Sequence, residues 1–392
     1  DLPVIELVSD PLNTLPSNAT SSFSHIPLPR NIFQGSDIPW LSSAGFDLDE
    51  RSTGIKFETA KFQMTELSSD RSQQPECETD MTENSTGDLR SSTSPADSSV
   101  VGHYSEATQA DVIAAIERAR NSLTDWSSRC VTERAAILKR AAELFEARTA
   151  EFTSLIAKEA GRTLNDGVDE VREAVDFCRY YAAQAMSLMH SELELPGVTG
   201  ETNRLSYAHR GPWLCISPWN FPLAIFTGQI VANLAVGNTV IAKPAEQTPL
   251  VAQLACDVLK EAGVPEGVLN LVNGDGPTLG SWLLPDERIA GVSFTGSHPS
   301  ARVINRQLAS RDGPIIPFIA ETGGINCMVV DSTALPEQVV DDVITSAFRS
   351  AGQRCSALRV LFVQSDVADG VIELLAGAMK ELKVGDPHKL ST

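Results

Sequence analysis

The chain of 392 residues has a mass of 42.1 kDa and carries 31 basic and 51 acidic side chains, a formal net charge of −20. This charge excludes a nucleic-acid-binding protein that depends on broad neutralisation of phosphates by lysine and arginine. Hydrophobic residues make up 42% and charged residues 21% of the chain, which excludes a wholly disordered protein and allows two or three domains of ordinary size.

The sequence contains no stretch typical of a targeting signal or a membrane span. No basic segment precedes an apolar run, and the longest apolar region, residues 221–236, is interrupted by Gly228, Gln229 and Asn233. The seven cysteines form no CxxC pair, and the six histidines show no spacing typical of metal ligands. We therefore predict a cytoplasmic protein whose thiols are reduced and mostly buried, with no metal, no membrane insertion and no nucleic-acid partner.

Residues 1–102 are predicted to form an acidic, Ser/Thr-rich linker region that is partly disordered. The first hundred residues hold 16 acidic and 6 basic side chains, and 13 of the 32 residues from Ser68 to Ser99 are Ser or Thr. Such a segment buries too little apolar surface to offset the entropy lost on ordering. The chain has no initial Met and stops at Thr392 without a closing element, so we expect an internal piece of a larger protein.

From Ala107 onward the pattern changes to that of an α/β protein. Helical periodicity begins there, a further helical stretch is expected between an N-cap at Thr132 and a stop at Gly161, and another helix over Val168–Met189. Short runs rich in β-branched residues then alternate with helices and with Gly or Pro turns. This alternation predicts a doubly wound parallel sheet. The predicted strands are 213–217, 239–242, 268–272, 290–294, 315–320 and 327–330, and a further one is expected at 358–363.

Three side chains near predicted strand ends could carry nucleophilic and acid–base chemistry. Cys355 lies in a small, polar segment beside Arg354, whose charge could lower the thiol pKa, although a buried structural cysteine is as consistent with the sequence. Glu321 follows an apolar run and precedes two glycines, which suits either a general base or a carboxylate that caps a turn. Asn220 stands between two prolines, either as a fixed oxyanion donor or in a plain Asx turn.

Other residues at strand ends could hold a nucleotide. Lys243 ends a predicted strand and Glu246 follows it, a pair that could bind the hydroxyls of a ribose or form a solvated ion pair. Ser297 stands where a helix is expected to begin, so it and the neighbouring N–H groups could face an anion. The run Gly274–Gly280 has the spacing GxGxxxG, which is weak support for a dinucleotide site.

Five motifs occur in order along the chain: Pro-Trp-Asn-Phe-Pro, Lys-Pro, Phe-Thr-Gly-Ser, Glu-Thr-Gly-Gly and Gly-Gln-Arg-Cys. In this combination the chain resembles the aldehyde dehydrogenase superfamily. Residues 346–359 and 320–324 most resemble the L-glutamate γ-semialdehyde dehydrogenase module of bifunctional PutA proteins. The resemblance extends over 103–392, and residues 26–50 weakly resemble the stretch that joins a proline dehydrogenase half to this module.

The resemblance implies an aldehyde dehydrogenase-like α/β fold, in which residues 103–323 form the NAD-binding domain with N-terminal helices and residues 324–392 begin a truncated catalytic domain. It implies Cys355 as the nucleophile that attacks the aldehyde, Asn220 as the oxyanion donor, and Glu321 as the base that activates water to hydrolyse the thioester. The implied cofactor-binding residues are Lys243, Glu246, Gly276, Gly296, Ser297, Ser217, Trp219 and Thr322, and the implied substrate contacts are Ser356 and Phe221.

The implied activity is NAD-dependent oxidation of L-glutamate γ-semialdehyde to L-glutamate in proline catabolism, by a homo-oligomer that acts on a small aldehyde. FAD is expected only if a proline dehydrogenase half precedes residue 1. The carboxylate of Glu246 favours NAD, because it would repel the 2′-phosphate of NADP. A non-catalytic scaffold, a CoA-dependent enzyme and a dehydrogenase for another aldehyde remain alternatives, although a CoA-dependent enzyme would not need Glu321.

Two departures from the family pattern limit what the resemblance implies. Residues 297–300 read Ser-His-Pro-Ser in place of the usual Ser-Thr-Glu-Val, which leaves the pyrophosphate contacts open. The chain also stops before the family's Glu-Ile-Phe-Gly-Pro motif. We therefore expect this piece to fold incompletely on its own and to have little activity.

Overall fold

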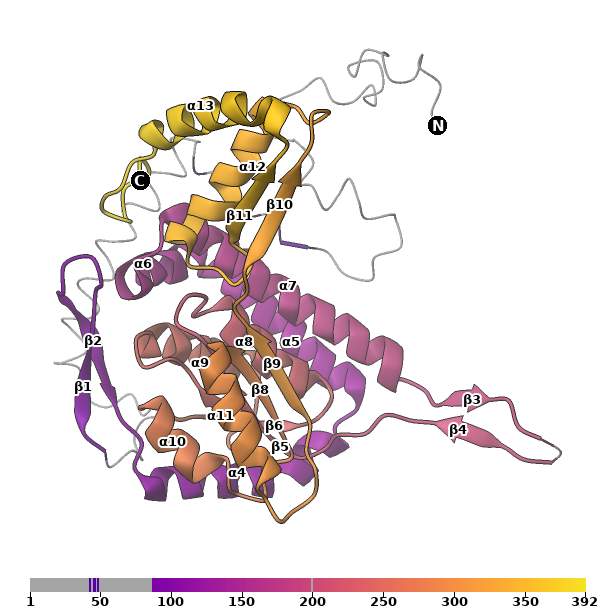
Figure 1. Cartoon of the computed structure of the whole chain (residues 1–392). Helices are drawn as coiled ribbons and strands as arrows, with labels where there is room; N and C mark the ends of the chain where they lie inside the picture. The colour runs from indigo at the N-terminus through magenta and orange to yellow at the C-terminus, as the bar shows by residue number, and fades with distance from the viewer. Residues whose placement is uncertain (1–41, 44, 47, 49–86, 199) are drawn as a thin grey trace. The chain divides into compact units, whose positions relative to one another are not determined.

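The computed structural model describes residues 42, 43, 45, 46, 48, 87–198 and 200–392. Within this part of the chain the largest sheet has five parallel strands in the order β7-β6-β5-β8-β9 (Figure 1). This confirms the expected doubly wound sheet. Its strands are β5 (Pro212–Ile216), β6 (Thr239–Lys243), β7 (Leu269–Leu271), β8 (Gly291–Gly296) and β9 (Phe318–Thr322).

Alternating side chains of the central strands enter two separate cores. Leu214 and Ile241 are register partners and lie in one core, whereas Val240 and Ala242 lie in the other. This is the period of two that a strand imposes, with helices covering each face of the sheet. The first core includes α4 (Gln109–Ser128), α10 (Gly276–Leu283) and α11 (His298–Ala309). The second includes α5 (Val131–Ala147), α6 (Thr149–Ala160), α7 (Leu164–Met189), α8 (Ala224–Ala235) and α9 (Pro249–Ala262).

The helix boundaries follow local capping, and two of the predicted boundaries are wrong. Thr132 is not an N-cap: α5 begins at Val131, and the preceding Cys130 makes no side-chain capping bond. α7 begins at Leu164 rather than at Val168, because the Thr163 hydroxyl accepts from Asp166 N. The stop at Gly161 is confirmed, since this residue has φ 65° and ends α6 in the left-handed conformation that glycine favours.

The last residues of the predicted linker region form part of a β-hairpin. β1 (Leu89–Thr93) and β2 (Val100–Ser105) form an antiparallel hairpin that includes the predicted boundary at residue 102. The Ser92 hydroxyl donates to Glu159 Oε1 at 2.7 Å, which ties the hairpin to α6. The rest of the predicted linker, residues 1–41, 44, 47 and 49–86, lies outside the described residues, and so does most of the stretch that resembles a PutA joining segment.

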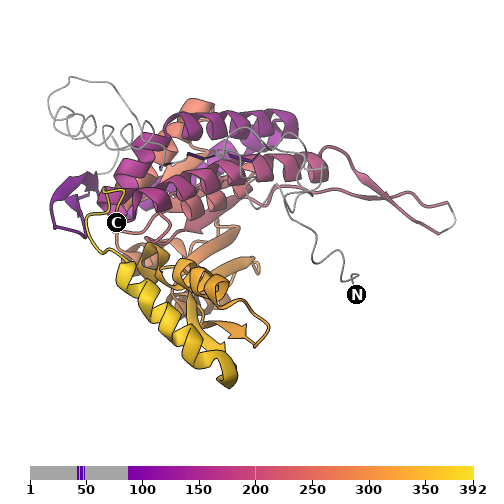
Figure 2. The same cartoon turned by 90° about the horizontal axis from the view of Figure 1, so that it is seen from above.

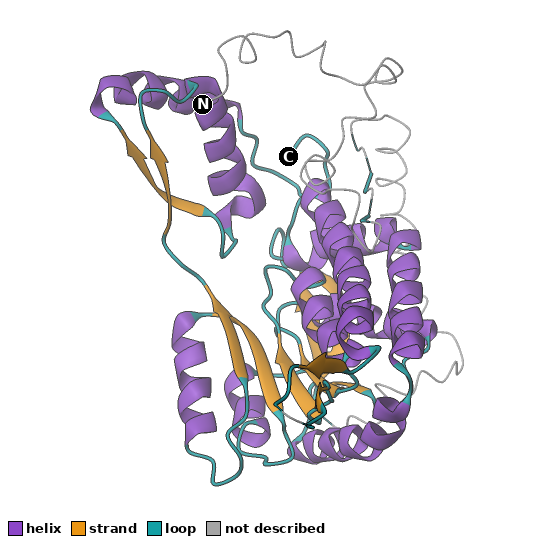
Figure 3. Cartoon of the chain, turned by 90° about the vertical axis from the view of Figure 1, so that its right-hand side faces the viewer, coloured by secondary structure: helices purple, strands orange, loops and turns teal. Residues whose placement is uncertain are grey.

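The sixth predicted strand belongs to a second sheet and not to the first. β10 (Asn326–Val330) pairs in parallel with β11 (Leu358–Val363), and the chain enters β10 only three residues after β9 ends (Figure 3). α12 (Pro336–Phe348) and α13 (Ser365–Glu381) lie side by side on this pair (Figure 2), with the 3₁₀ turn η3 (Arg349–Gly352) between α12 and β11. Val330, Val343, Leu358 and Val371 form a small core of their own.

A third two-stranded sheet extends away from the helices (Figure 1). It consists of β3 (Leu193–Leu195) and β4 (Asn203–Leu205), which pair in antiparallel fashion. Across the residues that the structure describes, none of the helices has the length and apolar character needed to span a bilayer. The same residues contain no cluster of three or more side chains suited to hold a metal ion.

Candidate active site

Several of the predicted cofactor residues lie at one edge of the five-stranded sheet, the edge formed by the carboxyl ends of its strands. β5 pairs with β6 on one side and with β8 on the other, so the strand order reverses at β5. In open α/β sheets, ligands bind outside the carboxyl ends of the strands at such a reversal. Ser217 directly follows β5, Lys243 is the last residue of β6, and Gly296 is the last residue of β8. Thr322, at the end of β9, is the register partner of Gly296.

Lys243 and Glu246 form an ion pair that is only partly solvated. Lys243 Nζ lies 3.3 Å from Glu246 Oε2 and donates to Pro244 O at 3.0 Å. The Lys243 side chain is 5% exposed and that of Glu246 44% exposed. Burial lowers the pKa of Lys243, although Glu246 opposes this. A Cβ on Gly276 would lie 4.0 Å from Lys243 Nζ, so this glycine borders the same space.

The polar groups around this edge fit a dinucleotide. The Ser217 hydroxyl is buried and has no hydrogen-bond partner in the described part of the chain, which leaves it available to a ligand. Ser297 is the N-cap of α11, and its hydroxyl accepts from Ser300 N at 3.2 Å. A Cβ on Gly296 would lie 2.6 Å from Cζ of the Phe294 ring, so a larger side chain would require that ring to move. Trp219, another of the predicted cofactor residues, is 41% exposed.

Cys355 and Glu321 line one cavity of about 750 Å³. Cys355 is exposed, so the alternative of a buried structural cysteine is wrong. The Glu321 carboxylate makes no hydrogen bond or ion pair with any described residue, so it does not cap a turn. An unpaired carboxylate and an accessible thiol on the same cavity are suited to act on the same ligand.

Asparagine side chains fix the loop that carries Cys355. Asn220 Nδ2 donates to Gln353 O at 2.7 Å, and since an amide nitrogen carries two N–H groups, one is left for a ligand. Asn326 Nδ2 donates to Cys355 O at 2.7 Å and to Ala357 O at 3.0 Å. Asn326 is not among the residues predicted from the sequence, where its one local signal is a polar residue at the start of an apolar strand.

Arg354, the neighbour of Cys355 in the sequence, bonds to the end of α12. Its guanidinium donates to Thr345 O at 2.7 Å and to Ser346 O at 3.0 Å, both in the last turn of α12. These bonds satisfy carbonyls at a helix C-terminus, where a cation is favoured. Of the predicted substrate residues, Ser356 is exposed beside Cys355. The centroid of the Phe221 ring lies 4.2 Å from Arg162 Cζ, a contact with a residue that the sequence does not single out.

Comparison with known proteins identifies the family. The family model described as "Aldehyde dehydrogenase family" matches residues 81–392. The chain belongs to the aldehyde dehydrogenase family. This confirms the resemblance inferred from the five motifs, together with the aldehyde dehydrogenase-like fold.

Three relatives of this aldehyde dehydrogenase chain show how far the similarity extends. Bifunctional protein PutA of Escherichia coli K12 is 44% identical over 409 aligned residues, which cover 100% of this chain and 29% of PutA. The 1-pyrroline-5-carboxylate dehydrogenase of Geobacillus sp. WCH70 is 40% identical over 296 residues, or 75% of this chain and 57% of that protein. The solved structure of 1-pyrroline-5-carboxylate dehydrogenase from Thermus with bound NAD superposes with a TM-score of 0.82 and 30% sequence identity. The match covers 90% of this chain and 69% of the Thermus chain.

The chain therefore spans a little under a third of the length of the PutA relatives that it matches.

Proposed function

We propose that the protein oxidises L-glutamate γ-semialdehyde to L-glutamate with NAD. The observation that carries this proposal is the placement of Cys355 and Glu321 on one cavity, with Asn220 bonded to the loop of Cys355. The names of the relatives, PutA and 1-pyrroline-5-carboxylate dehydrogenase, support the substrate and a role in proline catabolism.

The three side chains divide the chemistry between them. Cys355 Sγ attacks the aldehyde carbon, and the carbonyl oxygen becomes an oxyanion that accepts the second N–H of Asn220 and the Cys355 backbone N–H. Bound NAD would supply the acceptor for the hydride that leaves the former aldehyde carbon. Glu321 then takes a proton from a water molecule, whose oxygen attacks the resulting thioester and releases the carboxylic acid and the Cys355 thiol. The net change consumes the aldehyde, water and NAD⁺ and yields the acid, NADH and a proton.

The cofactor is proposed to bind at the sheet edge described above. Lys243 and Glu246 would hold the adenosine ribose beside Gly276, and Gly296, Ser297 and the α11 N-terminus would approach the pyrophosphate. Ser217, Trp219 and Thr322 complete the proposed cofactor set. Ser356, beside the nucleophile, and Phe221 are proposed to contact the substrate. FAD belongs only to a proline dehydrogenase half.

The proposed function is tested by NADH formation from L-glutamate γ-semialdehyde, with the full-length product of the gene assayed beside the 392-residue chain. Cys355→Ala should abolish turnover, while Cys327→Ala, which removes another exposed cysteine, should leave it unchanged. Turnover by the Cys355→Ala protein would refute the assignment of the nucleophile. A full-length protein that binds NAD but oxidises no aldehyde would instead support the scaffold alternative.

We also propose that the protein is a homo-oligomer. The β3–β4 hairpin exposes Leu193, Leu195 and Leu205 on strands of only three residues. An isolated two-stranded hairpin is marginally stable in water, so a second copy of the chain is the partner that would cover these side chains.

A further inference from the structure

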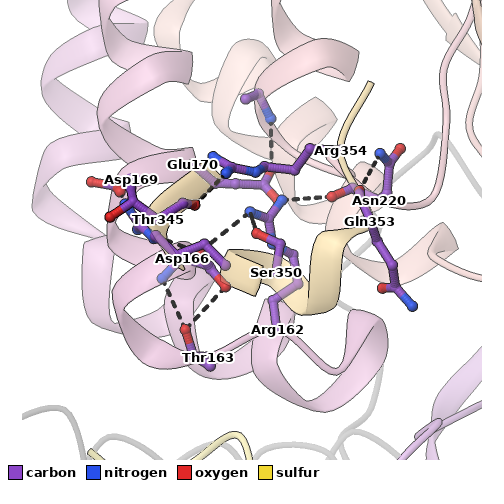
Figure 4. A network of polar contacts seen from close by, with 12 residues as sticks. Arg162, Thr163, Asp166, Asp169, Glu170, Asn220, Thr345, Ser350, Gln353 and Arg354 are labelled. Carbon is purple, nitrogen blue, oxygen red and sulfur yellow. Dashed lines mark hydrogen bonds and ion pairs between the residues drawn. The ribbon is translucent and has the colours of Figure 1, made fainter. Parts of the chain in front are cut away.

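The guanidinium of Arg162 connects the two segments that carry the proposed oxyanion donor and the nucleophile. Arg162 follows Gly161 at the end of α6, and its side chain is 6% exposed. Nη1 donates to Asn220 O at 2.5 Å, and Nη2 donates to Ser350 Oγ at 2.9 Å (Figure 4). One buried side chain thus holds both the turn at Asn220 and the start of the loop that leads to Cys355.

The position of Arg162 is itself fixed by a buried carboxylate. Arg162 Nη1 donates to Glu170 Oε1 at 2.6 Å, and the Glu170 side chain is fully buried. Glu170 Oε2 accepts from Leu223 N and from Ala224 N, each at 3.0 Å, at the N-terminus of α8. The Arg162–Glu170 pair therefore holds the turn on both sides, at Asn220 and where α8 begins.

The loop segment that Arg162 contacts has a backbone that needs external support. Ser350 and Ala351 have φ values of 55° and 52°, in the left-handed region that residues other than glycine seldom adopt. Such residues persist only where their surroundings hold them. The bond from Arg162 to the Ser350 hydroxyl supplies part of that support, and the Phe221 ring beside Arg162 lies against the same guanidinium.

We propose that Arg162 is a positioning residue that fixes the position of the Asn220 amide relative to the loop that carries Cys355. Its planar guanidinium, with donors that diverge in one plane, can reach Asn220, Ser350 and Glu170 at once, and the single ammonium of a lysine cannot. The catalytic consequence of this inference rests on the proposed function. The structural consequence does not rest on it: Arg162 is a shared tether, by which we mean one side chain that holds two segments of the chain in place.

Hydrogen–deuterium exchange of the purified full-length product tests the tether directly. Arg162→Lys should speed exchange several-fold in two peptides, 217–224 and 349–357, because it loosens both segments. Ser350→Ala removes only the bond to the loop, so it should speed exchange in 349–357 and leave 217–224 unchanged. Arg179→Lys is the matched control: Arg179 lies on α7, pairs with Glu146 at 2.6 Å, and its replacement should change neither peptide.

Faster exchange in only one peptide of Arg162→Lys, or in neither, would overturn the inference. If Arg162→Lys does not fold, the Ser350→Ala result decides alone, and unchanged exchange in 349–357 contradicts the tether.

Steady-state kinetics of the full-length product separates positioning from general stability. Displacing an oxyanion donor should lower kcat on the order of tenfold in Arg162→Lys. The KM for NAD should change much less, because six of the eight proposed cofactor residues lie outside the two loosened segments, and only Ser217 and Trp219 lie within 217–224. An unchanged kcat, or an equal change in kcat and in the KM for NAD, would contradict the positioning role. If the wild-type protein oxidises no aldehyde, the proposed function fails, while the exchange experiment still decides whether Arg162 is the shared tether.

Discussion

Exposure distinguishes Cys355 from three of the other described thiols, and its place on a cavity with Glu321 distinguishes it from the rest. Cys178, Cys215 and Cys256 are buried, and burial raises the pKa of Cys178 to about 12 and that of the other two thiols as well. Because the thiolate is the nucleophile, these three cysteines are inert at neutral pH. Half of the six described cysteines are exposed, so the prediction that most are buried is not confirmed for this part of the chain. Cys355 is the exposed cysteine that shares a cavity with Glu321.

Glu321→Gln should separate the two halves of the proposed reaction. The amide cannot accept a proton from water, but the attack by Cys355 and the hydride transfer do not need Glu321. We expect a rapid burst of about one NADH per site, followed by turnover 10²–10⁴-fold slower than that of the wild type. Rapid mixing measures the burst, and mass spectrometry of the quenched protein should find the acyl group on Cys355. A variant with normal steady turnover would assign the base to another residue.

Glu246→Gln should weaken the preference for NAD. The Glu246 carboxylate is half-exposed and paired with Lys243, so its removal takes away a negative charge near the proposed ribose site and frees a buried cation. We expect the ratio of kcat/KM for NADP to that for NAD to rise by about tenfold or less, because solvent screens part of the repulsion. The control is Glu287→Gln, at a carboxylate outside the proposed cofactor set, for which the ratio should not change.

The sequence predicts the side chains that we propose as reactive better than those that hold the site together. Cys355 and Glu321 stand in short segments whose composition already indicates exposed, flexible sites. Arg162 and Asn326 carry no such signal, because their partners are distant: Ser350 lies 188 positions after Arg162, and Cys355 lies 29 after Asn326. Only the fold brings these groups together.

Among the elements, the buried strands were predictable and the first hairpin was not. β6 is buried at all five residues, and between Thr239 and Lys243 its sequence is the apolar run Val-Ile-Ala. β1 is exposed at four of its five residues and reads Leu-Arg-Ser-Ser-Thr, which has the composition of a linker. The hairpin is ordered through tertiary contacts, of which the bond between Ser92 and Glu159 is one.

Glu159 should make the stability of this region depend on pH. Its buried carboxylate accepts from Ser92 Oγ, Leu250 N and Val251 N, and burial raises its pKa from 4.5 to about 7. The folded protein therefore keeps a proton that the unfolded chain loses above pH 4.5. The resulting contribution to stability is fully present below pH 4.5 and is lost as the pH rises through about 7. It amounts to about 3 kcal/mol at most.

The variant Glu159→Gln stays neutral and isolates this effect. The free energy of unfolding of the wild type, measured by urea denaturation, should fall relative to that of Glu159→Gln between pH 5 and pH 8. Glu151→Gln, on the same helix and 35% exposed, is the control and should follow the wild type. A constant difference between the wild type and Glu159→Gln over this range would show that Glu159 titrates normally.

At the scale of the whole described chain, the site is assembled from two sheets. Glu321 and Asn220 belong to the five-stranded sheet and its turns, whereas Cys355 lies on the loop before β11 of the small sheet. Hydrogen bonds from Asn220 to Gln353 and from Arg162 to Ser350 cross between them. The position of Cys355 relative to Glu321 therefore depends on contacts between two separately packed cores, which strand patterns alone could not predict.

The β3–β4 hairpin gives a test of assembly at the same scale. Leu193 and Leu205 are cross-strand partners and are 58% and 39% exposed, so replacing both with Thr keeps β-forming residues while removing apolar surface. If a second copy covers this pair, the double variant should dissociate at concentrations where the wild type is assembled. Light scattering coupled to size exclusion measures the mass. Leu89→Thr, at a residue 69% exposed in the other hairpin, should leave the mass unchanged. A double variant of unchanged mass would place any interface elsewhere on the protein. A wild-type protein that is already monomeric would contradict the proposed assembly, because the hairpin would then be stable without a partner.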